Sequence, residues 1–415
     1  SDRFMVGEIG GPARGPRRFE FLDGLRGVLS VYVLCTHVVV SDLYGASRSF
    51  RLAVRGFRYG QLAVDGFIVL SGFSLMLPVA AAAGARLRDG FRGYIRRRAR
   101  RILPAYLAAL AISVAVLAAV APFAPAGRSI WRTELSPIGI GSHVLLVHTL
   151  VPGQDQAINS AFWSIATEWH IYFFFPLLLL PVFRRFGAAW MVIVAVVVGS
   201  LPQFVASDSA IVNGCPWLLG LFALGAATAS AYASQDFSPR AALRRVPWLF
   251  AVGIAAFAIS RVLVWSPRLH ALFGQKMLSD LAVGLIWACV ILYGACLERV
   301  EGLDDTVPAR PRPLFLRLIA SPSAVALGGI SYSLYATHMP VLRALECSSR
   351  LMGLGPVANF LLRLLVGVPL ALGVAALFAR WFERPFLSSP PGQSPARRPT
   401  DAPRTTEGVM LAARE

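Results

Sequence analysis

The stretch LDGLRGVLSVYVLCTH, residues 22–37, has an arginine, Arg26, near one end and a histidine, His37, at the other, with an almost unbroken apolar helix from Val28 to Cys35 between them. At about 1.5 Å per residue, His37 lies roughly 16 Å beyond Arg26 along the helix axis. An arginine near a helix end extends its charged head to the membrane surface. A histidine about 16 Å further into the bilayer is too short to reach that surface. An ionisable group inside hydrocarbon marks either a functional site or a hydrogen bond to a neighbouring helix. The stretch therefore predicts a membrane-spanning helix that carries a candidate site.

The composition of the whole chain extends this prediction. The protein has 415 residues, of which 56% are hydrophobic and only 15% are charged, values that exclude an ordinary soluble globule. Apolar stretches long enough to span a bilayer, about 20 residues each, recur along the sequence. They predict an all-α, polytopic membrane bundle of about ten transmembrane helices, at residues 25–44, 61–80, 102–124, 161–182, 188–206, 215–232, 247–265, 278–298, 323–345 and 358–382.

Basic residues set the expected orientation of the bundle. Most of the 40 Lys and Arg fall in the two ends and in loops 86–101, 184–185, 240–245 and 299–317, which predicts that both termini are cytoplasmic. The net charge of +18 is then explained by anionic lipid headgroups rather than by nucleic acid. One group of arginines does not fit this orientation, because it would lie on the outer side of the membrane. Its segment either folds back onto the protein or meets an anionic ligand. Its members are Arg48, Arg51, Arg55 and Arg58.

Pro, Gly, Arg and Ser are abundant in residues 1–20 and 387–415, so both ends are predicted to be disordered cytoplasmic tails. Residues 21–386 then form the transmembrane domain that carries the function, in the plasma membrane and, in a bacterium, the inner membrane. The five cysteines show neither a disulfide framework nor metal-ligand spacing. We therefore expect no metal and no bound cofactor, and the oligomeric state stays open.

Six blocks of the sequence are similar to those of one known family, the acyltransferase-3 membrane proteins. Arg26 and His37 resemble the first-helix pattern of that family, an arginine and a histidine separated by ten residues. The blocks follow the family's order along nearly the whole chain. They are LDGLRGVLSVYVLCTH (22–37), DGFIVLSGF (65–73), RRRARRILPAY (96–106), FWSIATEWHIYFFFP (162–176), GGISYSLYATHMPV (328–341) and WFERPF (381–386).

This resemblance implies an integral membrane enzyme that moves an acyl group from acyl-CoA, its co-substrate, to a hydroxyl of a carbohydrate or a secondary metabolite. His170 departs from the pattern of its block, so no role is carried over to it. The chain also shows no appended soluble domain of the kind that some envelope-modifying members have. That difference favours a diffusible acceptor.

Acyl transfer to a hydroxyl needs a base, and His37 is the candidate. It acts either as general base or as an acylated nucleophile. Glu168, costly in lipid without a partner, either pairs with an arginine or supports His37 and the acceptor. Arg26 either anchors the helix at the membrane surface or contacts CoA. We predict these three residues as catalytic.

Guanidinium groups bind phosphates in a bidentate way, which makes the arginine run after residue 91 a candidate CoA site. Arg97 and Arg101 share a helical face by their i, i+4 spacing and are the preferred pair, although such clusters also serve as topology determinants. The predicted acyl-CoA-binding residues are Arg26, Arg97, Arg98, Arg101 and Ser71. The predicted acceptor-binding residues, which alternatively make only interhelical hydrogen bonds or interfacial anchors, are Asp65, Trp163, Ser164, Tyr172, Tyr335 and His338.

The sequence thus predicts a membrane O-acyltransferase that moves an acetyl or propionyl group to a sugar-containing or polyketide small molecule. An O-acetyltransferase of a cell-envelope glycan is one alternative. Another is a proton-coupled transporter, in which His37, Glu168 and His338 form a proton relay. The sequence shows no two-half repeat of the kind many transporters have, which counts against the transporter.

Overall fold

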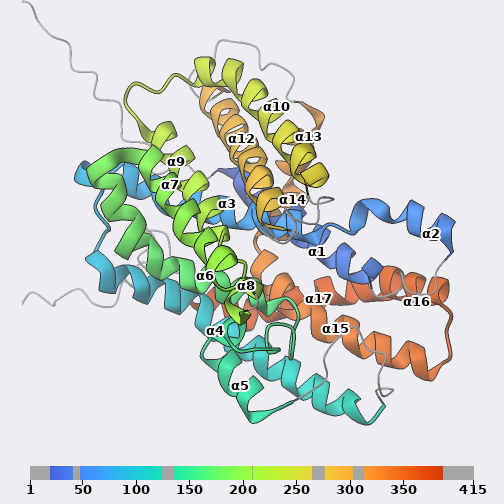
Figure 1. Cartoon of the computed structure of the whole chain (residues 1–415). Coiled ribbons are helices and arrows are strands. Elements are labelled where there is room, and N and C mark those ends of the chain that lie inside the picture. The colour runs from blue at the N-terminus through green and yellow to red at the C-terminus, as the bar shows by residue number, and fades with distance from the viewer. Residues whose placement is uncertain are drawn as a thin grey trace, which may run out of the picture.

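The computed structural model describes residues 19–40, 47–123, 135–207, 209–263, 276–301 and 313–386. Within these ranges every regular element is a helix, and the helices pack into one bundle (Figure 1). The predicted all-α membrane bundle is thereby confirmed. The predicted tails fall almost entirely outside the described residues, apart from Phe19 and Glu20, and α1 begins at Glu20.

Helices occupy every stretch that the sequence predicts to span. The longer ones are α1 (Glu20–Val40), α3 (Gly60–Ala80), α4 (Gly90–Val120), α6 (Phe162–Phe174), α7 (Leu180–Val205), α9 (Leu218–Ala233), α10 (Pro239–Leu263), α12 (Met277–Glu301), α15 (Ser331–Leu351) and α17 (Val368–Phe378). Shorter helices connect them: α2 (Arg48–Ala53), α5 (Pro137–Val144), α8 (Ala210–Asn213), α13 (Leu314–Ile319), α14 (Pro322–Gly328) and α16 (Pro356–Leu362). Single turns complete the order: η1 (Arg55–Phe57), η2 (Ala83–Ala85), η3 (Ala121–Phe123), η4 (His148–Leu150), η5 (Phe175–Leu179), η6 (Arg363–Gly367), η7 (Ala379–Glu383) and η8 (Arg384–Phe386).

Seven helical runs of the described residues are long and apolar enough to cross a membrane. One of them, Phe162–Val205, has 44 residues and would measure about 66 Å if straight, roughly twice the hydrocarbon thickness of a bilayer. Gly187 breaks it with φ 86° and ψ −178°, so this run covers two predicted spans. Two further predicted spans correspond to the short apolar α9 and to the more polar α15. The number of spans and the sidedness of the termini stay predictions.

Helices α3 and α9 cross at the centre of the bundle (Figure 1). A Cβ atom added at Gly72 would lie 2.0 Å from the carbonyl oxygen of Phe222, and one at Gly225 would lie 1.9 Å from that of Val69. Each glycine therefore lets the backbone of the other helix approach, as small residues do between membrane helices. Gly72 of the DGFIVLSGF block thus serves the packing of α3 against α9.

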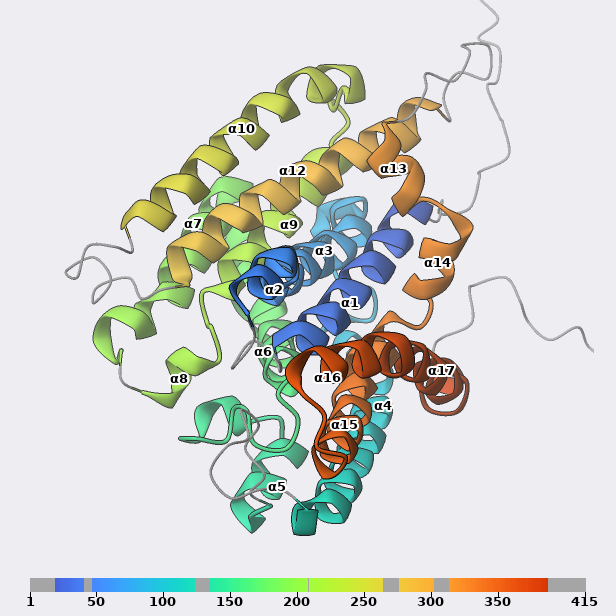
Figure 2. The same cartoon turned by 90° about the vertical axis from the view of Figure 1, so that its right-hand side faces the viewer.

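Helix α1 lies against α14 (Figure 2) and against the end of α13 through similar glycine contacts. A Cβ atom at Gly24 would meet the carbonyl oxygen of Ile319 at 1.8 Å, and one at Gly328 would meet that of Asp23 at 1.9 Å. The first and fifth sequence blocks are therefore in backbone contact. This contact fixes the turn of α1 that carries Arg26.

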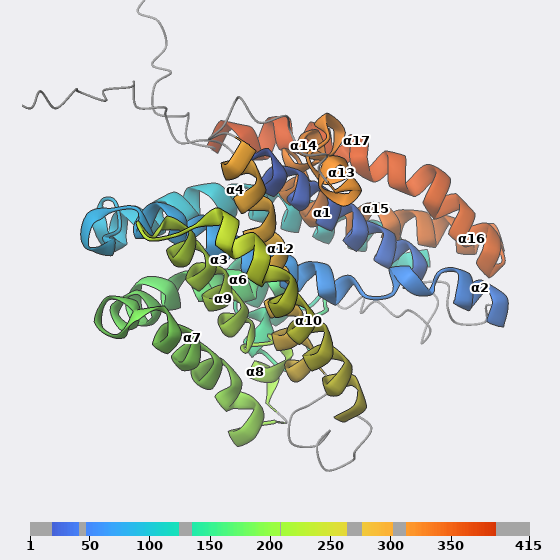
Figure 3. The ribbon, with the colours of Figure 1, turned by 90° about the horizontal axis from the view of Figure 1, so that it is seen from above.

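Helix α15 lies beside α17 (Figure 3) and also packs against α4. Pro340 lies inside α15 and has no N–H to donate to the carbonyl four residues earlier. That carbonyl, of Ala336, instead accepts a hydrogen bond from Asn159 Nδ2 at 3.2 Å. The connection before α6 is thereby tied to α15. At the other end, Ser333 donates to Glu383 of the WFERPF block at 2.5 Å.

The arginine-rich segment between α1 and α3 folds back onto the protein. Tyr32 of α1 donates to the carbonyl of Gly56 at 2.6 Å, and the ring of Phe50 contacts that of Phe360 at 5.1 Å between centroids. The first of the two alternatives for this segment is therefore supported, with its arginines exposed along α2, along η1 and at Arg58, just after η1.

A pair of histidines lies in the connection between α4 and α6, outside the spanning runs. His143 and His148 are fully buried, and their rings stack with centroids 3.9 Å apart and an interplanar angle of 5°. His143 donates from Nδ1 to the carbonyl of Gly139 at 2.7 Å. Burial, aided by the neighbouring His143, lowers the pKa of His148 to about 3, and burial also lowers the pKa of His143.

We expect the protein to lose stability as the pH falls from about 7 to about 4. Below the ordinary histidine pKa of about 6.5 the unfolded chain binds a proton at His148, whereas the folded protein does not until about pH 3. The free energy of unfolding therefore falls by about 1.4 kcal/mol per pH unit in this window. The apparent melting temperature of the purified protein measures it. His148→Phe should flatten the slope, and an unchanged slope in that variant would refute this cause.

Candidate active site

A cavity of about 350 Å³ opens among α1, α3, α4, α6 and α15, and we call it the inner cavity because it holds the arginines predicted to face the cytoplasm. Its charged lining is three arginines and one glutamate, so it suits an anionic ligand. The lining residues are Arg26, Val64, Phe67, Ile68, Leu70, Ser71, Ser74, Leu75, Pro78, Arg98, Arg101, Ile102, Ser164, Ile165, Glu168, Tyr172, Ser331, Tyr332 and Tyr335.

Arg26 is held in this cavity by two neighbours. Its guanidinium donates to Asp23 one turn earlier at 3.0 Å and to Ser74 of α3 at 2.8 Å. The carboxylate balances the charge, and the hydroxyl orients the planar head. Arg26 therefore presents its guanidinium to the inner cavity.

The arginine run of α4 divides between two surroundings. Arg98 and Arg101 line the inner cavity, and the buried Nε of Arg98 has no hydrogen-bond partner among the described residues. Arg97 instead contacts Asp89 at 2.6 Å and the carbonyl of Arg88 at 2.6 Å. Of the preferred pair, only Arg101 is therefore on the cavity wall, and the i, i+3 pair Arg98 and Arg101 takes that place.

Glu168 also lines the inner cavity. Tyr172, one turn further along α6, donates its hydroxyl to Glu168 at 2.5 Å and lies 3.3 Å from the hydroxyl of Ser71. This chain of polar groups joins α6 to α3. A role of Glu168 in supporting His37 stays a prediction.

A second cavity of about 690 Å³, the outer cavity, contains His37. Its charged residues are one acid, Asp155, and one base, Lys276, so its wall is close to neutral and rich in amides, hydroxyls and indoles. The lining residues are Thr36, His37, Gln61, Asp155, Gln156, Ser160, Trp163, Gln203, Ser207, Val212, Asn213, Cys215, Trp217 and Lys276.

His37 is in contact with a second histidine. Its Nδ1 lies 3.0 Å from the carbonyl of Val33 and 3.2 Å from Nε2 of His338, while Nδ1 of His338 lies 3.0 Å from the carbonyl of Leu334. Carbonyls only accept, so neutral His338 carries its proton on Nδ1 and accepts at Nε2. His37 then also carries its proton on Nδ1, and this one hydrogen is shared between the Val33 carbonyl and Nε2 of His338. Its other nitrogen, Nε2, is the basic one in this tautomer.

The two cavities approach each other at α6. Trp163 lines the outer cavity, whereas the next residue, Ser164, lines the inner one. The hydroxyls of Ser164 and Tyr335 are 2.6 Å apart, and the Tyr335 ring lies edge-on to that of His338, with centroids 5.9 Å apart. A thin wall of hydroxyl and imidazole groups therefore separates the cavities.

Asp65, predicted to bind the acceptor, is completely buried behind the outer cavity. Its Oδ1 accepts from Gln61 Nε2 at 3.2 Å, and the same nitrogen donates to Asp280 Oδ2, also at 3.2 Å. Trp217 adds a bond to Asp280 at 2.9 Å. Asp65 thus contacts a residue that lines the cavity, and a direct contact to an acceptor stays a prediction.

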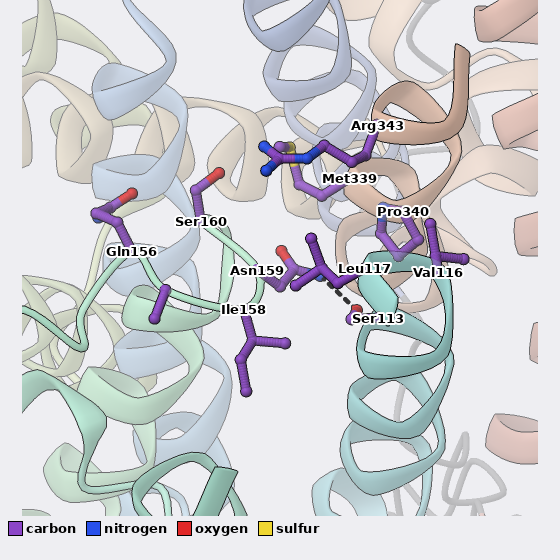
Figure 4. Close-up of a pocket in the computed structure, with 11 residues that line it drawn as sticks. Ser113, Val116, Leu117, Gln156, Ile158, Asn159, Ser160, Met339, Pro340 and Arg343 are labelled. Carbon is purple, nitrogen blue, oxygen red and sulfur yellow. Dashed lines mark hydrogen bonds between the residues drawn. The ribbon is translucent and has the colours of Figure 1, made fainter. Parts of the chain in front are cut away.

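A crevice of about 20 Å³ adjoins the outer cavity, with which it shares Gln156 and Ser160. Figure 4 shows Arg343 of α15 on one side and Asn159 below it, with Asn159 bonded to Ser113 at 3.1 Å. The volume is enough for about one water molecule. The crevice is therefore a small extension of the outer cavity.

Several lining residues carried no signal in the sequence. Ser74 and Tyr332 of the inner cavity, and Gln61 and Trp217 of the outer cavity, are common residue types in membrane helices or at their ends. Lys276 is the single lysine of the chain, and that rarity was a signal by which it could have been found. Metal ligands do not gather here: no three His, Cys, Asp or Glu residues of the described ranges are grouped to hold an ion.

The profile of a family described as an acyltransferase domain matches residues 19–380, and all of the residues that line both cavities fall in that range. The chain belongs to the acyltransferase-3 family. A curated relative, Acyltransferase MdmB of Streptomyces mycarofaciens, is 26% identical over 349 residues, which cover 81% of each protein. Protein 2 in the picA locus of Rhizobium radiobacter is 29% identical over 182 residues, 42% of this chain and 84% of its own length. No solved structure matches the chain.

Membership in the acyltransferase-3 family makes this bundle an integral membrane acyltransferase, which the sequence blocks had implied. The six blocks lie on α1, α3, α4, α6, α15 and η7, and five of those six elements line the inner cavity. The sixth, η7, contacts α15 through Glu383. The blocks are therefore spatial neighbours around one cavity.

Proposed function

We propose that the protein is a membrane O-acyltransferase that moves an acetyl or propionyl group from acyl-CoA to a hydroxyl of a sugar-containing molecule, with His37 as general base. The observation that carries this proposal is the pair of adjoining cavities of opposite chemistry. One is lined by arginines and the other by amides and indoles. His37 lines the second cavity and contacts His338, whose ring packs against Tyr335 of the first.

The inner cavity fits the donor. Coenzyme A carries phosphates, and guanidinium groups of Arg26, Arg98 and Arg101 bind phosphate oxygens through paired N–H donors. The roughly 16 Å from Arg26 to His37 along α1 is comparable to the length of a pantetheine arm. Acyl-CoA bound at the arginines therefore extends its thioester toward the wall of Ser164 and Tyr335.

The outer cavity fits the acceptor. The indole ring of Trp163 offers a face for a sugar ring, and the amides of Gln61, Gln203 and Asn213 pair with its hydroxyls. With one acid and one base beside His37, the cavity favours a neutral glycoside. An envelope glycan has the same chemistry, so the acceptor panel of the test includes both sources.

The chemical step then needs one base and one leaving group. Nε2 of His37 takes the proton of the acceptor hydroxyl, whose oxygen attacks the thioester carbonyl carbon and forms the ester C–O bond. The C–S bond breaks, and the CoA thiolate recovers the proton from His37. His338, which accepts from Nδ1 of His37, stabilises the transient imidazolium through this hydrogen bond.

Release of CoA thiol by the purified protein tests this function. Acetyl-CoA and propionyl-CoA are supplied with and without a panel of a glycosylated macrolide, 4-nitrophenyl glycosides and an N-acetylhexosamine oligosaccharide. Acceptor-dependent release supports the proposal, and the productive panel member identifies the acceptor class. Absence of both CoA binding and release, with a substrate-stimulated proton flux in vesicles, would favour the transporter instead.

We expect Arg98→Ala and Arg101→Ala each to raise the KM for acyl-CoA by about ten-fold or more, because each removes charge-assisted hydrogen bonds to a phosphate. Arg97→Ala is the matched control from the same run, since its guanidinium contacts Asp89 outside the cavity. Initial rates at varied acyl-CoA measure the effect. If Arg97→Ala has the larger effect, the CoA phosphates bind at the helical face of Arg97 and Arg101 that the sequence predicts.

A further inference from the structure

We propose that the side-chain carbonyl of Gln61 is a fixed hydrogen-bond acceptor in the outer cavity, where it binds a second hydroxyl of the acceptor and selects which hydroxyl reaches His37. This inference rests on the proposed function, because it assigns a positioning residue for the acceptor. The ligand it implies is a neutral diol or polyol, such as a sugar ring with neighbouring hydroxyls.

The orientation of the Gln61 amide follows from its two carboxylate partners. Nε2 lies 3.2 Å from Asp65 Oδ1 and 3.2 Å from Asp280 Oδ2. An amide nitrogen carries two hydrogens, so both are committed to these bonds. The opposite assignment would place the carbonyl oxygen against two carboxyl oxygens, and both carboxyls would have to be protonated to donate to it. The amide is therefore held with Nε2 facing the two carboxyl groups and Oε1 facing away from them.

The carboxyl pair is itself held rigidly. Asp65 is 0% exposed and Asp280 is 3% exposed, and the indole of Trp217 donates to Asp280 Oδ2 at 2.9 Å. Oδ2 of Asp65 is buried with no partner in the part of the chain that the structure describes. The network joins α3 to α12 and to the start of α9, and Gln61 is its member that lines the cavity beside Trp217. The sequence singled out Asp65; its role in this proposal is to position Gln61.

Gln61 also lies close to the proposed base. A Cβ atom added at the neighbouring Gly60 would be 3.0 Å from Thr36 Cγ2, so the start of α3 packs against the turn of α1 that carries Thr36 and His37. All of Thr36, His37 and Gln61 line the same cavity. When one hydroxyl of the acceptor's sugar ring donates to Gln61 Oε1, the position of the ring is fixed. Only certain of its other hydroxyls can then reach His37 Nε2.

The test compares Gln61→Leu and Asp65→Asn with wild type. Leucine removes the carbonyl at similar volume. An amide at position 65 can donate to Gln61 and so no longer fixes which end of Gln61 faces the cavity. We expect each variant to raise the acceptor KM about ten-fold, the loss of one hydrogen bond, and to convert a single acylated regioisomer into a mixture. The KM for acyl-CoA should stay within two-fold. Gln154→Leu, a glutamine that lines neither cavity, is the control.

Regiochemistry, determined by NMR of the acylated product, separates positioning from a structural role, because partial unfolding lowers the rate without redistributing product. Unchanged acceptor KM and a single regioisomer in both variants, with wild type active, would overturn this inference and leave the proposed function intact. A Gln154→Leu effect equal to that of Gln61→Leu would also overturn it. If wild type acylates no panel member, the proposed function fails, and Gln61 has no acceptor to position.

Discussion

His37→Ala should lower acceptor-dependent CoA release by about 10²- to 10⁴-fold, the contribution of a positioned general base. The reason is the geometry of its ring: His338 and the carbonyl of Val33 hold the Nδ1 side, so Nε2 is the nitrogen that accepts the proton. Binding of acyl-CoA should survive, because the arginines line the other cavity. Initial rates and a CoA-binding measurement on the same preparation check both statements.

Two further variants sharpen this result. His338→Ala should lower the rate less, by about ten-fold, because it removes only the group that stabilises the imidazolium. His170→Ala removes another imidazole from a spanning helix and is the matched control, with an expected rate near that of wild type. An acyl group found on His37 in the absence of acceptor would favour the nucleophilic route over general base catalysis. Wild-type activity in His37→Ala would refute both.

Gly225→Val should abolish recovery of folded protein, because the new side chain would meet the backbone of α3. Its Cβ atom would lie 1.9 Å from the carbonyl oxygen of Val69, a distance that only a shift of the whole helix relieves. Gly72→Val should act in the same way from the other side, at 2.0 Å from the carbonyl of Phe222. The measurement is the yield of monodisperse protein in detergent on size-exclusion chromatography.

The matched control for this pair is Gly373→Val on α17, where a Cβ atom would have nothing within 4 Å. It should be recovered at wild-type yield, since valine is well tolerated on an open face of a membrane helix. Wild-type yield and melting temperature for Gly225→Val would mean that α3 and α9 are not packed through these glycines.

Much of the fold was readable from hydropathy. Long apolar stretches recur because the bilayer core demands backbone hydrogen bonds within each segment, and helices are found at every predicted span. The break at Gly187, which divides a run of 44 residues, also agrees with the separate spans predicted on either side of it. The backbone contacts at Gly24 and Gly328 were not foreseen, because a glycine does not show which helix approaches it.

The candidate site was readable only in part. Within the arginine run, i, i+4 spacing favoured Arg97 and Arg101, but a short loop brings Asp89 to Arg97 and leaves Arg98 on the cavity wall. Several predicted acceptor residues, including Ser164 and Tyr335, line the inner cavity. Helical spacing tells which side chains share a face, whereas the cavity that the face meets depends on neighbouring helices.

The sequence by itself determined that this protein is a helical membrane bundle of the acyltransferase-3 family, with Arg26 and His37 at two depths of one helix, because hydropathy, helical rise and motif order are local properties of the chain. Only the tertiary structure decided that His338 contacts His37 across 301 positions, and that Gln61 bridges Asp65 to Asp280. Such contacts depend on helix crossings fixed by close packing of glycines and side chains, which no single segment encodes.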